Sequence, residues 1–408
     1  MVADSAEASA LRAKMVDGLL GRGGIRSAAV EAAMRTVPRH LFVPDAPLER
    51  AYGMDSVVTY RDEGGIAISS ASGPGVVGAM LEQLDVHPGH RVLEVGAGTG
   101  YNAACLAELA GPSGSVTTID IGEEMAADAR RGLASGGYER VRVVHGDGAD
   151  GYGPGAPYDR IIVTAGAWEV MPTWREQLAE GGRLVLPLRV RGVTRTVALE
   201  QHGEIWRSTS LNECGFMPMR GPHAVEERDV ELPPDTGVRI RVDDGLPADF
   251  EALGKALSCP PSLAWPGVVV QLKPLALEHL DFWLAGADAQ VCRVIPLSRA
   301  LEAGLVPPLY AWGSMGCYSS GTLGYLIRRP AAGSEGHKMM ELGACAYGPD
   351  AQRLAGEIAG RILAWQQASP GPSGLRIEVH FAGKPVTTPA MIAAEKRHGT
   401  VLVFQVPA

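Results

Sequence analysis

One stretch of sequence decides the fold of this chain: Val92-Leu93-Glu94-Val95-Gly96-Ala97-Gly98-Thr99-Gly100-Tyr101. A run of apolar residues, typical of a buried strand, leads into glycines at alternate positions, which let the backbone approach a ligand closely. The glycines follow a GxGxG spacing rather than the GxGxxG of dinucleotide-binding folds, and Glu94 stands at the end of the strand. This spacing favours S-adenosylmethionine over NAD; the alternative is an ordinary strand-to-helix turn.

Further strand signals follow in order, and each ends in residues suited to one part of that cofactor. Residues 116–120 end in Asp120, a carboxylate that suits a ribose diol, and residues 141–148 end in Gly-Asp-Gly, where Asp147 suits an adenine amine. Residues 158–166 end in small residues, at the edge where open parallel sheets bind ligands. The candidate cofactor-binding residues are Glu94, Gly96, Ala97, Gly98, Thr99, Gly100, Asp120, Ile121, Asp147 and Gly148.

The pattern of elements changes near residue 225. Before it, strand signals alternate with helical patterns, which is typical of a doubly wound parallel sheet. After it we expect a hairpin of residues 321–328 and 338–347, an amphipathic helix over 350–367, and closing strands at 375–381 and 400–406. We therefore predict a doubly wound Rossmann-like α/β domain over residues 1–225 and a smaller α+β domain over residues 226–408.

Charge and hydropathy restrict the class of partner. The chain has 46 Asp and Glu against 37 Lys and Arg, a formal net charge of −9, whereas binding to nucleic-acid phosphates needs a basic surplus. Its apolar runs are shorter than a membrane span, and residues 1–7 are polar and acidic, unlike a signal peptide. We expect no nucleic-acid partner, no membrane partner and a cytoplasmic location.

Metal-binding motifs are also missing from the sequence. The six cysteines form no Cys-x-x-Cys pair, which favours buried thiols over metal ligands. His87 and His90 flank a Pro-Gly turn and are expected to be loop histidines. We predict no metal site.

Several motifs resemble those of the protein-L-isoaspartate (D-aspartate) O-methyltransferase family. Residues 37–44, Val-Pro-Arg-His-Leu-Phe-Val-Pro, followed by Ala51-Tyr52, are similar to its N-terminal signature. Ser72-Gly73-Pro74 resembles its Ser-x-Pro substrate loop, and residues 181–187 resemble its late strand. The resemblance covers residues 10 to 220 approximately. It implies a class I S-adenosylmethionine methyltransferase domain that releases S-adenosylhomocysteine.

The same resemblance implies a carboxylate acceptor. A carboxylate is already ionised at neutral pH, so positioning and desolvation can supply most of the rate without a base. Ser72 is the candidate catalytic residue, because its hydroxyl could orient one carboxylate oxygen; the alternative is an N-cap of a helix over residues 75–84. The candidate substrate-binding residues are Ser70, Ser72, Pro74, Thr164, Ala165 and Gly166.

The region after residue 225 resembles an extension found on homologues that accompany ribosomally made, modified peptides of the lanthipeptide, graspetide and lasso-peptide pathways. Residues 61–71 also depart from the Gly-x-Gly-Gln-Thr-Ile stretch usual before Ser-x-Pro. We therefore expect a peptide or protein partner that carries Asp or isoaspartate. The favoured substrate is a modified, constrained precursor peptide whose Asp side chain is methylated, leading to aspartimide or isoaspartate.

Two alternatives remain open at this point. One is a repair methyltransferase that acts on the isoaspartyl α-carboxylate of damaged proteins, and the other is a non-catalytic protein that keeps the cofactor fold. The C-terminal region is expected to recognise the peptide through hairpin edges and exposed aromatic residues, namely Trp312, Tyr318 and Tyr325. The alternative for this region is stabilisation of the first domain or dimerisation.

Overall fold

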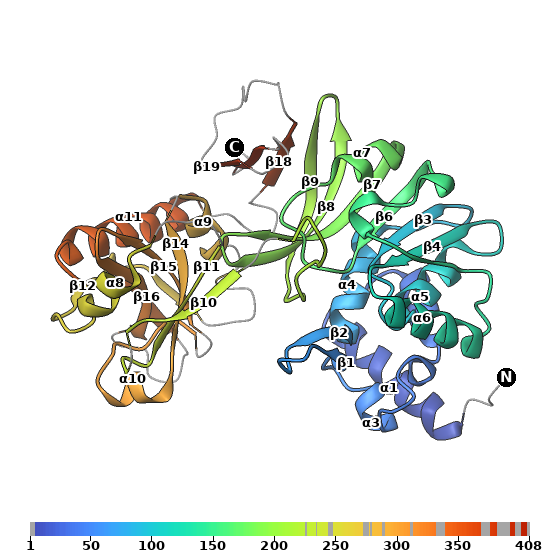
Figure 1. Ribbon diagram of the computed structural model, residues 1–408, viewed down its shortest axis with the longest axis horizontal. Helices are drawn as coiled ribbons and strands as arrows, with labels where there is room; N and C mark the ends of the chain where they lie inside the picture. Colours follow the sequence, from blue (N-terminus) through green and yellow to red (C-terminus); the bar gives the residue numbers. More distant parts are fainter. Residues whose placement is uncertain are drawn as a thin grey trace.

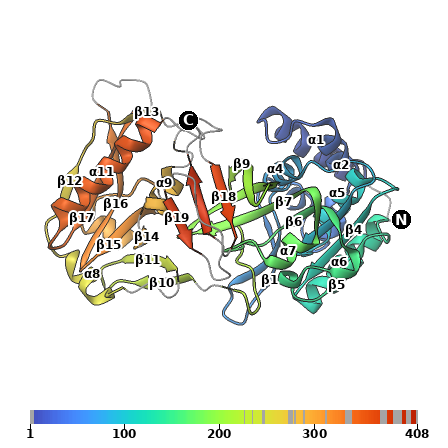
Figure 2. The ribbon, with the colours of Figure 1, turned by 90° about the horizontal axis from the view of Figure 1, so that it is seen from above.

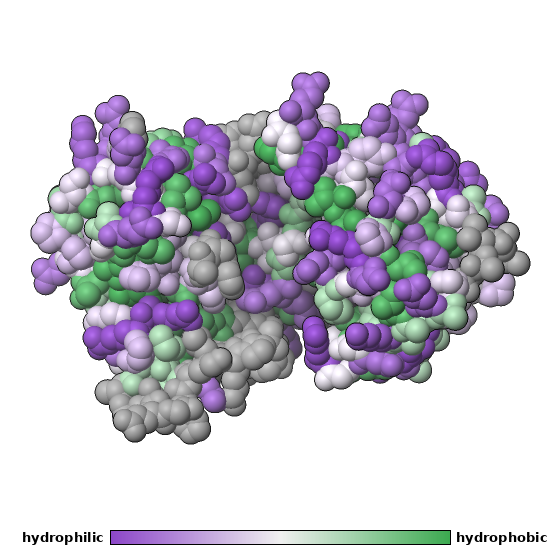
Figure 3. Space-filling view, turned by 90° about the horizontal axis from the view of Figure 1, so that it is seen from below, coloured by the Kyte–Doolittle hydropathy of each residue, from purple (hydrophilic) through white to green (hydrophobic). Residues whose placement is uncertain are grey.

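The computed structural model describes residues 5–224, 227–233, 235–243, 248–271, 277, 280–287, 290–310, 313–331, 339–368, 376–381, 392–395 and 401–405. Within these residues, a ten-stranded and an eight-stranded sheet organise the molecule, and a separate hairpin lies beside the first of them (Figure 1). Seen from below, the surface is hollowed between the parts that the two large sheets form (Figure 3). None of the described helices is long and apolar enough to cross a bilayer.

The ten-stranded sheet begins as the predicted doubly wound α/β fold. Its parallel part has the order β5-β4-β3-β6-β7, and β8 and β9 extend it in antiparallel fashion. The strands are β3 (Arg91–Val95), β4 (Ser115–Asp120), β5 (Arg142–His145), β6 (Tyr158–Val163), β7 (Leu178–Val190), β8 (Val193–His202) and β9 (Ile205–Glu213). The strand order reverses between β3 and β6, which is where doubly wound sheets bind ligands.

Alternating side chains on these strands build two apolar layers. Val92 of β3 and Ile162 of β6 face a layer with the N-terminal helices, while Leu93 and Ile161 face the opposite layer with Trp174. This alternation is the two-residue period of a strand buried on both faces. The helices of this part are α1 (Ala6–Gly21), α2 (Ala28–Thr36), α3 (Leu48–Ala51), α4 (Pro74–Leu84), α5 (Tyr101–Ala110), α6 (Glu123–Gly136) and α7 (Pro172–Gln177), with short 3₁₀ helices η1 (Arg39–Phe42), η2 (Gly148–Asp150) and η3 (Gly153–Gly155).

The eight-stranded sheet is antiparallel and contains the predicted hairpin, since β16 and β17 pair side by side. Its strands are β10 (Glu227–Glu231), β11 (Val238–Asp243), β12 (Ser262–Ala264), β13 (Val269–Gln271), β14 (Val291–Pro296), β15 (Ser314–Ser319), β16 (Thr322–Pro330) and β17 (Met339–Tyr347). Its helices are α8 (Phe250–Ala256), α9 (Leu280–Ala287), α10 (Ser298–Glu302) and α11 (Ala351–Ala368). Helix α11 is the predicted amphipathic helix, and Leu354, Ile358 and Ile362 form its buried face.

Two aromatic residues expected on the surface of this region are instead buried. Tyr318 is 3% exposed and Tyr325 is 0% exposed, because α8 and the loop around Val306 cover the face of the sheet opposite α11. The hydroxyl of Tyr325 donates to the backbone oxygen of Val306 at 2.7 Å. The expectation of exposed aromatic anchors is therefore wrong for these two tyrosines, and Trp312 lies outside the described residues.

The C-terminal strands return to the first sheet. β18 (Arg376–His380) pairs with β9, and β20 (Val401–Gln405) and β19 (Ile392–Glu395) continue outward from it, so these strands lie between the two halves (Figure 2). Arg207 of β9 and Glu378 of β18 form an ion pair at 2.8 Å across this junction. The two sheets thus do not divide the chain at residue 225, and independent domains with that boundary stay a prediction.

A continuous apolar cluster joins the two halves. It runs from Leu188 of β7 through Phe282 of α9 to Leu354 of α11. Polar contacts flank it: Arg191 donates to the backbone oxygen of Ala285 at 2.9 Å. The seam between the sheets is therefore a packed interface.

Candidate functional site

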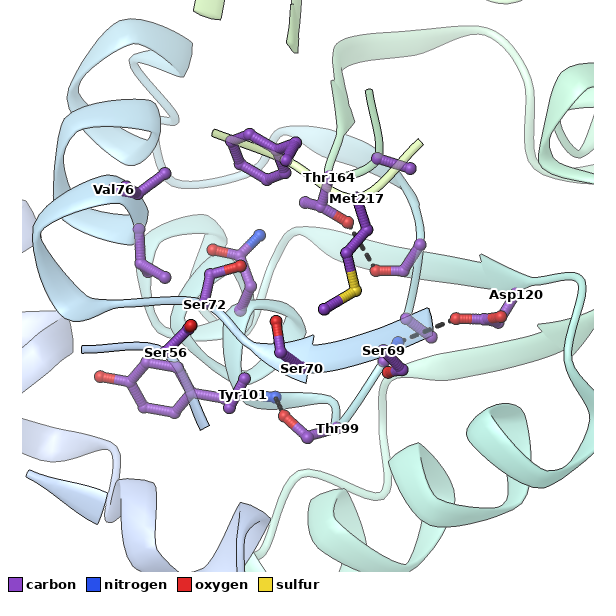
Figure 4. Close-up of a pocket in the computed structure, with 18 of the residues that line it drawn as sticks. Ser56, Ser69, Ser70, Ser72, Val76, Thr99, Tyr101, Asp120, Thr164 and Met217 are labelled. Atoms are coloured by element: carbon purple, nitrogen blue, oxygen red, sulfur yellow. Dashed lines mark hydrogen bonds between the residues drawn. The ribbon is translucent and has the colours of Figure 1, made fainter. Parts of the chain in front are cut away.

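A cavity of about 640 Å³ opens at the carboxyl ends of β3, β4 and β6, where the strand order reverses (Figure 4). Its volume lies in the range typical of sites for small ligands. Twelve of the predicted site residues line it, and they come from β2 (Ala67–Ala71) and the loop after it, from the glycine loop and from the ends of the parallel strands. These residues are Ser70, Ser72, Glu94, Gly96, Ala97, Gly98, Thr99, Asp120, Ile121, Gly148, Thr164 and Ala165.

The glycine loop has a conformation that other residues rarely adopt. Gly96, Gly98 and Gly100 have φ angles of +104°, +50° and +85°. A Cβ atom on Gly96 would lie 2.4 Å from Oγ1 of Thr164, and one on Gly148 would lie 2.3 Å from Val95. The absence of these side chains therefore keeps the two loops in close contact with the neighbouring strands and leaves the space in front of them open.

Asp120 is fixed at one end of the cavity. Its Oδ2 accepts a hydrogen bond from the amide of Gly98 at 2.9 Å, and its Oδ1 accepts one from the amide of Gly122 at 3.0 Å. The guanidinium of Arg220 lies 3.8 Å from Oδ1. A carboxylate has about four acceptor positions, so these contacts orient Asp120 and leave capacity for ligand hydroxyls.

Glu94 is fully buried behind the loop. Its two oxygens accept hydrogen bonds from Asn102 Nδ2 at 2.7 Å and from Thr118 Oγ1 at 2.6 Å. Burial raises the pKa of Glu94 to about 7, although both donors oppose that change. The group thus sits near half-protonation at neutral pH.

The other end of the cavity is rich in hydroxyl groups. Ser56, Ser70 and Ser72 line it, whereas Ser69 lies beside Gly98, and Figure 4 shows Ser72 and Asp120 toward opposite ends. The proposed N-cap role of Ser72 is not what the structure shows, because Gly73 is the N-cap of α4 and no side chain caps that helix. Pro74 at the first helical position has no N–H, so this end of the helix has one unpaired backbone donor fewer.

Arg39 is a residue of this end that sequence reasoning did not assign to the site. It is 0% exposed and donates from Nε to the backbone oxygen of Ala51 at 2.8 Å and from Nη2 to that of Ser72 at 2.7 Å. Its guanidinium carbon lies 4.7 Å from the centre of the Tyr101 ring. The feature of the sequence that could have indicated Arg39 as a site residue is its position in the motif of residues 37–44. These contacts tie that motif to the Ser72 loop.

A second group that the sequence did not reveal covers the cavity. Residues 215–220 contribute to the lining and are held by backbone bonds to Gly166: Gly166 donates to Met217 at 2.8 Å and accepts from Met219 at 2.9 Å. The side chain of Arg189 donates to the backbone oxygen of Phe216 at 3.1 Å. Since these pairings are long-range, no local pattern in the sequence indicates them.

Four predicted site residues are not part of the lining. Pro74 is the first residue of α4, Gly100 is the N-cap of α5, and Gly166 forms backbone hydrogen bonds with residues 217 and 219. Asp147 caps η2, accepting the amide of Ala149 at 2.9 Å through Oδ1. Its role as the adenine acceptor stays a prediction.

A smaller hollow of about 230 Å³ adjoins the hydroxyl-rich end. It shares Met54, Gly73 and Val76 with the main cavity and continues toward Asn212 and Glu213 at the end of β9. The two hollows are therefore contiguous at the Ser72 end of the cavity. Among the described residues, no group of three His, Cys, Asp or Glu side chains is placed to hold a metal ion.

Comparisons with known proteins agree on one family. The model of the protein-L-isoaspartate (D-aspartate) O-methyltransferases matches residues 10–223. The chain is 43% identical over 219 residues to protein-L-isoaspartate O-methyltransferase of Methanopyrus kandleri, a match that spans 53% of this chain and 94% of that relative. It is 42% identical over 215 residues to that of Methanoregula boonei, across 53% of this chain and 95% of that relative.

One solved structure extends the likeness to the C-terminal region. It is named protein-L-isoaspartate O-methyltransferase and covers 91% of this chain and 96% of its own, with a TM-score of 0.51 and 21% sequence identity. At this identity the likeness concerns the fold. Together with the match of residues 10–223, the glycine loop and the cavity, it leads to one conclusion: the chain belongs to the protein-L-isoaspartate (D-aspartate) O-methyltransferase family and is an S-adenosylmethionine-dependent carboxyl methyltransferase.

Proposed function

We propose that this chain methylates the free α-carboxylate of isoaspartyl residues in peptides and proteins, the first step in repair of damaged aspartate. The observation that carries the proposal is a single cavity with two ends, the glycine loop and Asp120 at one and Ser72 at the other. It occurs in a chain that is 43% identical to a protein-L-isoaspartate O-methyltransferase across 94% of that relative.

The described residues fit S-adenosylmethionine at the glycine end. Gly96 and Gly148 stand where a Cβ atom would clash with Thr164 and Val95. Two backbone amides hold the carboxylate of Asp120 in place, and its remaining acceptor positions suit a ribose diol. The amides of the glycine loop are suited to the carboxylate of the methionine portion. When bound, the cofactor supplies a methyl group on a positively charged sulfur.

The Ser72 end would hold the acceptor carboxylate. Ser72 is half-buried and lines the cavity, and within the described residues its hydroxyl has no hydrogen-bond partner. The hydroxyl can therefore donate to one carboxylate oxygen and leave the other directed along the cavity. Because the carboxylate needs no deprotonation, orientation and exclusion of water are the contributions required of the protein.

Tailoring of a constrained precursor peptide receives no support from the comparisons. That hypothesis depended on the added C-terminal region and on the altered stretch of residues 61–71, but a solved structure named for isoaspartate methylation also covers 91% of this chain. A region of this size therefore does not separate the two hypotheses. The proposed role of the region in peptide recognition also loses Tyr318 and Tyr325 as anchors, since both are buried.

The test is a methyl-transfer assay of the full chain with three peptides. One carries isoaspartate, one is the same sequence with normal aspartate, and one is a cyclised precursor-type peptide. We expect methyl ester on the isoaspartyl peptide in clear excess over the other two. Preference for the cyclised peptide would restore the tailoring hypothesis and reject the repair proposal.

A further inference from the structure

Arg39 carries a positive charge that no described carboxylate neutralises. The side chain is 0% exposed, and its hydrogen bonds go to the backbone oxygens of Ala51, Ala71 and Ser72. Its Nη1 has no hydrogen-bond partner, although it is buried. Burial lowers the pKa of the guanidinium, but arginine keeps its proton in proteins. The ring of Tyr101, 4.7 Å from the guanidinium carbon, offsets part of the cost of burying this charge, but no described carboxylate pairs with it.

The charged side chains that line the cavity show that an anionic acceptor could neutralise Arg39. The acidic side chains of the lining are Asp55, Glu94 and Asp120. The basic side chains of the lining are Arg39 and Arg220. Arg220 lies 3.8 Å from Asp120, at the cofactor end, so its charge is balanced there. Without Arg39, an anionic acceptor would enter a site dominated by carboxylates.

Arg39 lies at the end where the acceptor would bind. It donates to the backbone of Ser72 at 2.7 Å, and it lines the same cavity. A charge buried in a low-dielectric wall acts on a nearby anion more strongly than a charge in water does. The side chain does not need to touch the acceptor to do so.

We propose that Arg39 is a specificity-determining residue whose buried charge makes the Ser72 end of the cavity select an ionised carboxylate over a neutral group of the same shape. This inference rests on the proposed function, since it concerns the acceptor of that reaction. It separates two contributions of Arg39: the hydrogen bonds hold the Ser72 loop, and the charge attracts the acceptor.

The experiment compares two peptides in the presence of S-adenosylhomocysteine. The first has an isoaspartyl residue with its free α-carboxylate, and the second is the same peptide with an α-carboxamide in place of that carboxylate. Calorimetry gives the ratio of their dissociation constants. The wild type is expected to favour the carboxylate by about tenfold or more, the effect of one nearby unscreened charge.

Three variants isolate the cause. Arg39→Met removes the charge and should bring the ratio close to one. Arg39→Lys keeps the charge but loses the planar fork, so it should weaken both peptides and preserve the ratio. Arg220→Met is the matched control, because it removes a positive charge from the other end of the cavity and should leave the ratio unchanged. Binding of S-adenosylhomocysteine shows that each variant is folded.

A purely structural role gives a different pattern. Equal losses of affinity for both peptides in folded Arg39→Met would overturn the inference and leave the proposed function standing. If Arg39→Met does not fold, Arg39→Lys decides: a preserved ratio supports the charge, and a ratio near one rejects it. If the wild type binds neither peptide and methylates no isoaspartyl peptide, the proposed function and this inference both fail.

Discussion

Thr118 Oγ1 donates a hydrogen bond of 2.6 Å to Oε2 of Glu94, and both residues are 0% exposed. Burial nevertheless raises the pKa of Glu94 from 4.5 to about 7. The folded protein therefore holds a proton that the unfolded chain releases between these pH values. The stability that this group contributes is complete below pH 4.5 and is lost as the pH rises to about 7.

The corresponding prediction concerns Glu94→Gln. The neutral amide should remove this decline, which is on the order of 3 kcal/mol for a pKa difference of this size. Denaturant unfolding at a series of pH values measures it. Exposed Glu49→Gln is the control and should keep the wild-type slope. An unchanged slope in Glu94→Gln would show that another group causes the pH dependence.

Asp120→Ala should weaken cofactor binding by about 1–3 kcal/mol, because it removes an acceptor for buried polar groups. It also frees the amides of Gly98 and Gly122, which now donate to its oxygens. Calorimetry with S-adenosylmethionine measures the change. Asp159→Ala is the control: this carboxylate accepts the amide of Arg91 at the opposite end of the strands, so cofactor affinity should not change.

Gly96→Ala should abolish tight cofactor binding. Gly96 has a φ of +104°, and the new Cβ would lie 2.4 Å from Thr164 Oγ1, so the loop must move. Gly137→Ala is a matched control, since Gly137 has a φ of +83° but nothing within 4 Å of a new Cβ. It should lower the melting temperature and spare cofactor affinity. Equal affinity in the two variants would contradict the role assigned to the loop.

Ser72→Ala should lower kcat/KM for the isoaspartyl peptide about 10²-fold or more, the scale of one lost transition-state donor. The dissociation constant of Ser72→Ala for the cofactor should stay within about a factor of two of the wild-type value. Ser27→Ala provides the contrast, because Ser27 is a true N-cap whose hydroxyl accepts from Val30 at 3.3 Å. That variant should lose stability and keep its transfer rate. Parallel losses in Ser72→Ala would indicate a structural role instead.

Local patterns predicted the part of the site that local backbone geometry builds. The glycines at 96, 98 and 100 and the carboxylate at 120 follow directly from strand–loop spacing, and all but Gly100 line the cavity. Arg39 belongs to the motif of residues 37–44, but its burial beside Ser72 depends on packing between η1 and the loop that holds Ser72. The cover of residues 215–220 depends on pairing with Gly166, fifty residues earlier.

The C-terminal region shows the same limit. The period of residues 350–367 predicted α11, and two strand-like runs around a Gly-Ser-rich turn predicted the β16–β17 hairpin. The sequence alone could not show that α8 and the loop around Val306 cover the face of the sheet that holds Tyr318 and Tyr325, so both tyrosines were expected to be exposed. It also could not show that β18 pairs with β9 across more than 160 intervening residues.

The return of β18 to β9 has a consequence for how this protein is made. The second sheet is topologically an insertion into the first, because the chain leaves after β9 and comes back at β18. During synthesis, the edge of β9 beside Trp206 stays unpaired until β18 has been made, because β18 follows more than 160 residues later. The last three strands of the ten-stranded sheet can therefore join it only after the whole inserted region has been synthesised.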